Sequence, residues 1–343
     1  MTKGNRLFNV AIVGATGAVG EVMLALLHDR KFPYGEVYAI ASARSAGHRV
    51  SIGDSSIVVT CLEEFDFNKV DIAFFSAGGS VSKKFAPEAV KAGCVVIDNT
   101  SAFRYCEKTP LVVTEVNAGD IKAYDETGII ANPNCSTIQM VVALKPIHDM
   151  AEVTRVNVAT YQAVSGTGKS GLEELAVQTG NILNARPVES AVYPKQIAFN
   201  CIPQIDEFLE NGYTREEMKM VWETKKIMSC PSIQVNATAV RVPVFFGHSE
   251  AVHIETSRKI TSAQVVKALK KAPGVSVVDV RQDGGYPTSV TEAVDKDDVF
   301  VGRIREDISH PSGINMWVVS DNVRKGAALN SIQIAELLIQ DHL

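Results

Sequence analysis

The segment Gly14–Gly20, with the sequence GATGAVG, constrains the fold of this chain more than any other stretch. It follows an apolar run at Phe8–Val13 and precedes Glu21–His28, whose apolar residues recur at helical spacing. A strand, a glycine turn and a helix in direct succession begin a βαβ unit. The spacing is G-x-x-G-x-x-G, and glycine also marks plain tight turns. Its position before a helix N-terminus nevertheless predicts a dinucleotide site, where backbone N–H groups meet a pyrophosphate.

The segments that follow predict a parallel sheet. Short apolar runs that are typical of buried strands lie at Glu36–Ala41, Val70–Ser76, Val95–Asp98 and Ile129–Ala131. A helical pattern near residues 82–92 separates two of them. Near-continuous apolar strands that alternate with helices indicate a parallel sheet covered on both faces, as in Rossmann-type domains.

The pattern changes after residue 150. Val153–Ala163 and Val235–Val244 alternate apolar and polar residues, as half-exposed strands do, and Ala251–Ser257 and Val275–Val280 are similar. We expect a second, α+β domain with a largely antiparallel or mixed sheet. The helical segment Val323–Ile339 carries apolar residues on one face and is expected to return to the first domain.

The length of 343 residues is consistent with two domains, at about 150 residues each. We expect a dinucleotide-binding domain formed by residues 1–133 and 323–343. A catalytic domain is expected over residues 134–322.

Composition excludes several classes of protein. The chain has 34 Lys and Arg against 39 Asp and Glu, a net charge of −5, which argues against a general nucleic-acid binder. No apolar stretch is long enough to span a membrane, and the N-terminus lacks the pattern of a signal peptide. Six cysteines in 343 residues are too few for a disulfide scaffold, and they contain no C-x-x-C pair, so neither a zinc ribbon nor a redox dithiol is indicated and no metal site is predicted. A reducing, cytoplasmic location is expected.

The end of the second predicted strand indicates the cofactor. NAD-binding domains usually place an acidic residue there, to bind the ribose 2′-hydroxyl. This chain has Ser42, Arg44 and Ser45 instead, and no acid. A guanidinium suits a 2′-phosphate, so we predict NADP, against the alternative that Arg44 is a solvated surface charge.

Asn134-Cys135-Ser136-Thr137 is the candidate for nucleophilic chemistry. Cys135 lies between a strand end and a helix expected from about Ser136 to Leu144, with Pro146 helping to end it. The helix dipole lowers a thiol pKa there, and free N–H groups would serve as oxyanion donors. Most single cysteines are structural, so local sequence leaves both interpretations open.

Three further segments are candidates for the same site. His248 is expected in a loop between two strands, where it could act as a base. Gln162–Lys169 is a glycine-rich turn after a strand, and Arg241 interrupts an apolar strand, where a cation needs an anionic partner. Glu216 and its neighbours read, by themselves, as a solvated helix face.

Taken together, these motifs resemble the aspartate-β-semialdehyde dehydrogenase family. The resemblance rests on the serial order of many segments and covers nearly the whole chain. These segments are GATGAVG at 14–20, SARSAG at 42–47, FFSAGGS at 74–80, DNTSAFR at 98–104, NPNCSTIQM at 132–140, TYQAVSGTG at 160–168, AFNCIPQID at 198–206, EEMKM at 216–220, RVPVFFGHSE at 241–250, FVGRIRED at 300–307 and MWVVSDNVRKGAALNS at 316–331.

The resemblance implies the role of each site residue. Cys135 would form an acyl thioester, His248 would be the acid/base catalyst, and Gln162 would orient the substrate. The other implied substrate contacts are Asn134, Arg241 to the α-carboxylate, Glu216 to the α-amino group, and Arg104 and Lys219 to the phosphate. The implied NADP contacts are Gly14, Thr16, Gly17, Ala18, Val19, Ser42, Arg44, Ser45, Ser165, Gly166 and Asn322.

The resemblance also implies the reaction and the partners. It implies reductive dephosphorylation of L-aspartyl-4-phosphate to L-aspartate 4-semialdehyde, with release of inorganic phosphate, and a homodimer or homotetramer that dimerises through the second domain. Two alternatives remain at this point. One is N-acetyl-γ-glutamyl-phosphate reductase, which would have less use for a carboxylate at Glu216, and the other is a non-catalytic nucleotide-binding regulator.

Overall fold

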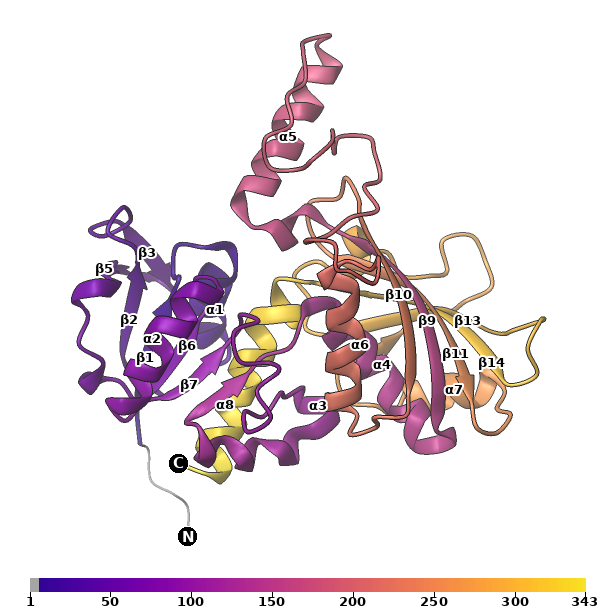
Figure 1. The fold of residues 1–343 in the computed structure, drawn as a ribbon, viewed down its shortest axis with the longest axis horizontal. Coiled ribbons are helices and arrows are strands. Elements are labelled where there is room, and N and C mark those ends of the chain that lie inside the picture. Colours follow the sequence, from indigo (N-terminus) through magenta and orange to yellow (C-terminus); the bar gives the residue numbers. More distant parts are fainter. Residues whose placement is uncertain (1–5) are drawn as a thin grey trace. The chain divides into compact units, whose positions relative to one another are not determined.

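The computed structural model describes residues 6–343, which divide into two compact units (Figure 1). The first unit contains residues up to Pro133 together with Ala327–Leu343, and the second is Asn134–Gly326. Residues 323–326, which we expected in the first domain, lie in the second unit. Asp321 holds them there, because its carboxylate accepts the N–H groups of Val323 and Arg324 and its carbonyl accepts that of Gly326.

A six-stranded sheet forms the centre of the first unit, in the order β5-β2-β1-β6-β7-β8. All neighbouring strands are parallel, so the predicted parallel sheet is confirmed. The sheet order places β1 between β2 and β6, which is the switch point where doubly wound sheets bind ligands. The strands are β1 (Phe8–Val13), β2 (Tyr34–Ala41), β5 (Thr60–Cys61), β6 (Ile72–Phe75), β7 (Val95–Asp98) and β8 (Ile129–Ala131).

Helices cover both faces of this sheet because successive strand residues point to opposite sides. Val10 and Ile12 pack in one core with side chains of α1 (Ala18–Asp29) and α8 (Asn330–Asp341). Ala11 and Val13 pack in the other core with α2 (Gly79–Lys91). The unit also contains α3 (Thr114–Asn117), the hairpin of β3 (Arg49–Ile52) and β4 (Ser55–Val58), and the 3-10 helices η1 (Leu62–Glu64), η2 (Phe67–Lys69) and η3 (Ala118–Glu126).

The second unit has a six-stranded mixed sheet in the order β10-β9-β11-β14-β13-β12, as predicted. Its strands are β9 (Val153–Gln162), β10 (Gln234–Arg241), β11 (His248–Thr256), β12 (Val275–Val277), β13 (Val299–Glu306) and β14 (Gly313–Ser320). The helices α4 (Cys135–Ala151), α6 (Arg215–Ile227) and α7 (Ser262–Leu269) pack on it. Its short helical turns are η4 (Val164–Thr167) and η5 (Ser289–Ala293), and η6 (Arg324–Leu329) spans the boundary at Gly326.

Two sequence-based expectations are wrong in this unit. Helix α4 does not end near Pro146 but continues to Ala151. Pro146 removes one backbone donor, and the buried side chains of Ile147 and Ala151 stabilise the last turns despite that loss. His248 does not lie in a loop, because β11 begins at this residue and its side chain is fully buried.

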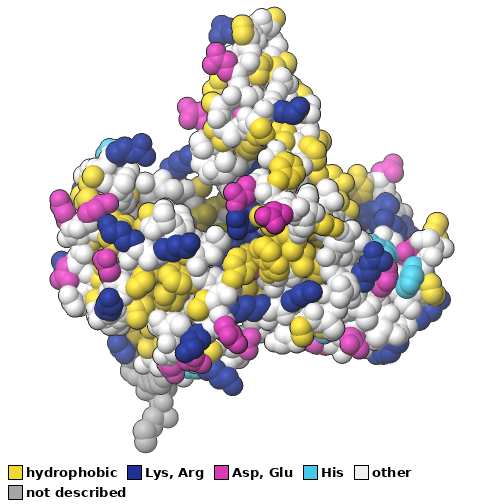
Figure 2. All heavy atoms as spheres, in the orientation of Figure 1, with side chains coloured by type: hydrophobic (Ala, Val, Ile, Leu, Met, Phe, Trp, Pro, Cys, Tyr) yellow, Lys and Arg dark blue, Asp and Glu magenta, His cyan; other side chains and the backbone are white. Residues whose placement is uncertain are grey.

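Helix α5 (Lys169–Leu183) projects from the second unit, and residues 184–199 return along it (Figure 1). The returning chain is fixed by two buried side chains of the helix. Glu174 accepts backbone N–H groups from residues 191–193, and Gln178 accepts those of residues 197 and 198. Hydrophobic side chains are visible along this arm in Figure 2, and Val177 and Leu183 are exposed.

Neither a membrane-spanning helix nor a metal-binding group of side chains is found among the described residues. Within 6–343, no helix is long and apolar enough to cross a membrane. Over the same range, His, Cys, Asp and Glu side chains form no group of three or more that could hold a metal ion.

Candidate active site

Cys135 is the first residue of α4, and the preceding residue, Asn134, caps this helix. The Asn134 Oδ1 atom accepts the N–H groups of Ser136 and Thr137, at 3.1 and 3.2 Å. The Asn134 N–H donates in turn to Glu223 Oε2 of α6, at 2.6 Å. Cys135 is therefore half-buried at a well-anchored helix N-terminus, where the dipole favours a thiolate.

The cap changes one expectation about this helix end. We expected free N–H groups in the first turn as oxyanion donors, but those of Ser136 and Thr137 are already bonded to Asn134. These two N–H groups are therefore not free to stabilise a developing negative charge near Cys135.

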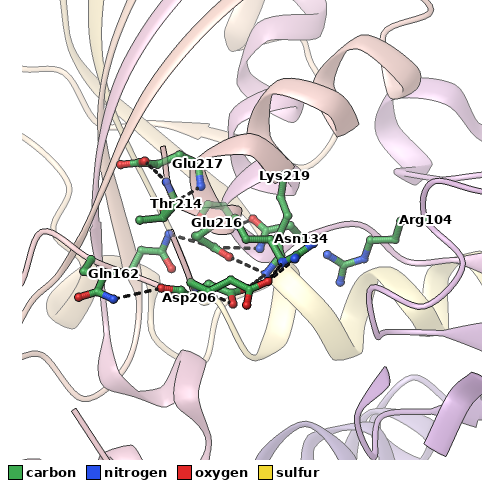
Figure 3. A network of polar contacts seen from close by, with 12 residues as sticks. Arg104, Asn134, Gln162, Asp206, Thr214, Glu216, Glu217 and Lys219 are labelled. Carbon is green, nitrogen blue, oxygen red and sulfur yellow. Dashed lines mark hydrogen bonds and ion pairs between the residues drawn. The ribbon is translucent and has the colours of Figure 1, made fainter. Parts of the chain in front are cut away.

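Glu216 of α6 lies at the centre of a buried polar network (Figure 3). Its Oε1 atom accepts from Asn134 Nδ2 at 2.9 Å and from Gln162 Nε2 at 3.1 Å, and its Oε2 atom lies 3.1 Å from Lys219 Nζ. Burial alone would raise its pKa, but Lys219 and these hydrogen bonds lower the pKa to about 2. Glu216 is an ionised, buried group, so its interpretation as a solvated helix face is wrong.

Lys219 is shared between Glu216 and Asp206, whose Oδ2 atom lies 2.8 Å from Lys219 Nζ. Burial opposes the charge of Lys219, but these two carboxylates raise its pKa. Sequence reasoning missed Asp206, which has a left-handed φ of 70° in the loop before α6. It also missed Glu223, which looks like any other charge of a helix until its buried bond to Asn134 is seen.

Gln162, Arg241 and His248 come from neighbouring strands of the mixed sheet. Gln162 ends β9 and pairs with Arg241, which ends β10. Ala163 joins Arg241 to His248, because its carbonyl accepts from Arg241 Nη1 at 2.8 Å and its N–H donates to His248 Nδ1 at 3.1 Å. The structure thus brings together these three residues, which the sequence placed in separate segments.

His248 is neutral in this environment. Burial lowers its pKa to about 3, and the nearby positive charge of Arg241 acts in the same direction, against Glu216. Because Nδ1 accepts the Ala163 N–H, the proton of the neutral ring is on Nε2. No described residue is hydrogen-bonded to that Nε2 atom, so it is a buried donor available to a substrate.

Arg241 is suited to an anionic ligand. It is only 6% exposed, and it makes no ion pair with any carboxylate of residues 6–343. A buried guanidinium without a counterion is unfavourable, and a ligand carboxylate would supply the missing charge.

Gly326 determines how closely the chain approaches Cys135. A Cβ atom at this position would lie 2.8 Å from Cys135 Cβ and 3.2 Å from Cys135 Cα. We expect Gly326→Ala to displace Cys135 and to lower kcat by about 10-fold or more, as misplacement of a reacting group does. Gly180→Ala is the control, because a Cβ there meets nothing within 4 Å. Steady-state kinetics measure both, and equal kcat values would contradict this role of Gly326.

The first unit holds the glycine loop in a conformation that fits a dinucleotide. Gly14 has a φ of 95°, and a Cβ there would lie 2.7 Å from the Ser76 carbonyl oxygen. The loop leads directly into α1, so the predicted contacts Thr16, Gly17, Ala18 and Val19 surround the N-terminus of a helix. A pyrophosphate fits such a helix end.

The residues after β2 also fit the predicted cofactor. Ser42 and Arg44 are exposed, and Ser45 is half-buried. Arg44 forms no ion pair within the described part of the chain, so its guanidinium is available to a phosphate.

Other predicted contacts are divided between the two units. Arg104 is buried in the first unit, where its Nη2 atom donates to the Asn99 carbonyl at 2.8 Å. In the second unit, the Asn322 Oδ1 atom accepts from Ser165 Oγ at 3.0 Å and from the Gly247 N–H at 2.9 Å. Gly166 is exposed, and a Cβ there would lie 2.8 Å from Arg241 Nη1.

Comparison with known proteins agrees with this geometry. The family described as "Semialdehyde dehydrogenase, NAD binding domain" matches residues 9–124, and "Semialdehyde dehydrogenase, dimerisation domain" matches residues 144–325. An aspartate-semialdehyde dehydrogenase from Legionella pneumophila is 60% identical, over 99% of this chain and 98% of that protein.

Solved structures give the same result. The crystal structure of aspartate semialdehyde dehydrogenase II from Vibrio cholerae, complexed with ASA, has a TM-score of 0.97 and 57% identity, and the match covers 98% of this chain and 100% of that one. An aspartate semialdehyde dehydrogenase from Candida albicans, solved with NADP, has a TM-score of 0.76 and 27% identity, over 97% and 99% of the two chains.

These matches favour neither alternative, the N-acetyl-γ-glutamyl-phosphate reductase or the non-catalytic regulator. They extend over both units and over every predicted site segment. The chain belongs to the aspartate-semialdehyde dehydrogenase family.

Proposed function

We propose that the protein catalyses the reversible, NADPH-dependent conversion of L-aspartyl-4-phosphate to L-aspartate 4-semialdehyde and inorganic phosphate. The carrying observation is the buried network in which one carboxylate, Glu216, contacts both the cap of the Cys135 helix and Gln162. This reaction would serve biosynthesis of lysine and diaminopimelate, threonine, methionine and isoleucine in the cytoplasm.

The first chemical step uses Cys135. Its thiolate attacks the acyl carbon, a C–S bond forms, and phosphate departs with the electron pair of the broken C–O bond. The resulting thioester divides one difficult reduction into two easier steps. NADPH, when bound, supplies the hydride for the second step.

His248 acts on the oxygen of the reacting carbon. When that carbon is tetrahedral, its oxygen carries negative charge, and the buried Nε2–H of His248 can donate to it. Collapse of the tetrahedral species then breaks the C–S bond, releases the aldehyde and returns the electron pair to the Cys135 sulfur. Gln162 would orient the substrate in both steps.

The substrate's charged groups each have a complementary residue. Arg241 would bind the α-carboxylate, and the ionised Glu216 would bind the α-ammonium group. Arg104 and Lys219 would bind the phosphate. Lys219 is already paired with Asp206 and Glu216, so a phosphate would compete with Asp206 for it.

Three groups of residues are proposed to contact NADP. The glycine loop would contact the pyrophosphate, and Arg44, with Ser42 and Ser45, would contact the 2′-phosphate. Ser165, Gly166 and Asn322 would contribute contacts from the second unit. The exposure of Arg44 and the Candida albicans structure with NADP support this assignment.

A spectrophotometric assay of nicotinamide reduction tests the proposed function. We expect turnover with aspartate semialdehyde, phosphate and NADP, and lower kcat/KM with NAD. Turnover of N-acetylglutamate semialdehyde in place of aspartate semialdehyde would contradict the assignment.

Arg241→Ala is expected to raise KM for aspartate semialdehyde by about 10- to 100-fold, because a charge-assisted hydrogen bond contributes about 1.5–3 kcal/mol. The KM for phosphate is expected to stay within about threefold. The control is Arg155→Ala, since Arg155 forms an exposed pair with Glu255 at 3.4 Å. A change confined to the phosphate KM would show that Arg241 binds the other end of the substrate.

The protein is proposed to be a homodimer, or a tetramer of two dimers. The match of residues 144–325 to a dimerisation domain supports self-association through the second unit. Light scattering after size-exclusion chromatography distinguishes the two assemblies, and a monomer at micromolar concentration would contradict both.

A further inference from the structure

A buried carboxyl group that the proposed mechanism does not use lies close to His248. Glu250 is two residues after His248 on β11, so both side chains point to the same face of the sheet. Its Cα atom pairs with Thr160 of β9 and with Val318 of β14. Glu250 is fully buried.

The surroundings of Glu250 provide no counterion. Within residues 6–343, neither carboxyl oxygen makes an ion pair or a well-formed hydrogen bond, and the paired residues Thr160 and Val318 carry no charge. Burial raises the pKa of Glu250 well above its ordinary value, and only the side chain of Gln139 opposes this. An ionised carboxylate here would be a buried charge without compensation, so the group is a neutral acid.

Gln139 links Glu250 to the nucleophile. It lies four residues after Cys135 on α4, so both side chains are on the same side of that helix, one turn apart. Gln139 is fully buried, and neither of its amide atoms has a well-formed hydrogen bond within the described residues. Glu250 and Gln139 are thus two polar groups facing each other where α4 packs on β11.

We propose that Glu250 is a positioning residue that acts as an uncharged carboxylic acid through Gln139. Together they fix how α4 sits on the sheet, and so fix Cys135 relative to His248. A neutral acid can donate to the amide oxygen and accept from the amide nitrogen, and an apolar residue can do neither. The proposal rests on the proposed function only for its kinetic readout.

Glu250→Gln, Glu250→Met, Gln139→Met and the double Met variant test the proposal. We expect Glu250→Gln to keep kcat within twofold, because the amide is also neutral and has both a donor and an acceptor. Glu250→Met is expected to lower kcat at least tenfold, with KM for aspartate semialdehyde within threefold. It should also change the rate of Cys135 alkylation by iodoacetamide at least threefold, measured by peptide mass spectrometry.

The effects of Glu250→Met and Gln139→Met on kcat are expected to be coupled. The double variant should be no slower than Glu250→Met alone, because both substitutions remove the same contact. If Glu250→Met does not fold, Glu250→Asp replaces it. The shorter acid withdraws from Gln139, and the same fall in kcat is expected.

Two results would overturn the proposal. If Glu250→Met lowered the melting temperature but left kcat and Cys135 alkylation unchanged, Glu250 would be structural only. If Glu250→Gln were as slow as Glu250→Met, Glu250 would act as an ionised carboxylate or in proton transfer, which a neutral amide cannot replace, and not as a neutral positioning group. Alkylation of Cys135 requires no substrate, so it tests the positioning role even if wild-type protein fails to turn over aspartate semialdehyde.

Discussion

Cys135→Ala is expected to reduce turnover of aspartate semialdehyde by at least about 1,000-fold, because we propose that its thiolate forms the thioester. Cys135 is the thiol at the capped N-terminus of α4. Burial raises the pKa of the Cys94 thiol to about 12, so that cysteine cannot substitute for it. Steady-state kinetics with NADP and phosphate measure the loss.

The variant must also be shown to remain folded and able to bind the cofactor. We expect its affinity for NADP to match that of wild-type protein, measured by isothermal titration calorimetry. Cys201→Ala is the matched control, since Cys201 is exposed, and it should retain full activity. Residual activity of Cys135→Ala above a few per cent of wild type would show that the nucleophile is another residue.

His248→Asn is expected to lower kcat by about 100- to 10,000-fold, the range typical for loss of a positioned acid or base. The KM for aspartate semialdehyde should change much less, because Arg241 and Glu216 are proposed to hold the substrate. His48→Asn is the control at an exposed histidine. If kcat fell by less than threefold, a group other than His248 would stabilise the reacting oxygen.

The lowered pKa of His248 also predicts how stability depends on pH. Its pKa is about 3 in the folded protein and 6.5 as the ordinary value, so between these values the unfolded chain binds the extra proton. Stability is therefore lost as pH falls below 6.5, by up to about 1.4 kcal/mol per pH unit from this group. Glu250 contributes the opposite slope above its ordinary value of 4.5, because its folded pKa is raised.

Comparing the unfolding free energies of wild type and His248→Asn isolates the contribution of His248 to the pH dependence of stability. Urea unfolding of wild type and His248→Asn between pH 5 and pH 6.5 should show a steeper loss of stability on acidification in the wild type. Parallel curves would mean that His248 binds the same number of protons in the folded and the unfolded chain over this range, so that folding does not lower its pKa.

Sequence alone predicted most of the fold because the strands of the first unit are short, apolar and bounded by turns. The glycine loop, β1 and β7 lie where their patterns placed them. The end of α4 was not predicted, since the cost of an internal Pro146 is offset by burial that only the tertiary structure supplies. The sequence also does not reveal the hydrogen bonds by which the Asp321 carboxylate accepts the N–H groups of Val323 and Arg324. These bonds keep residues 323–326 in the second unit.

The sequence supplied the residue types of the proposed site but not the hydrogen-bond network that joins them. Cys135 had the signal of a strand end followed by a helix, and Arg241 had the signal of a charge in an apolar strand. Glu216, Glu223 and Glu250 had no such signal, because each depends on partners that are distant in the chain. Burial of a carboxylate on an otherwise polar helix cannot be read from spacing alone.

Glu216 has two roles, one proposed in substrate recognition and one in anchoring Asn134, and together they limit how this enzyme can acquire new substrates. The carboxylate proposed to recognise the α-ammonium group is also a hydrogen-bond partner of Asn134, the residue that caps the helix of Cys135. A variant redesigned for N-acylated substrates would have to remove that negative charge, and it would loosen the cap at the same time. Broadening the specificity at this position therefore requires a compensating substitution that anchors Asn134 by another route.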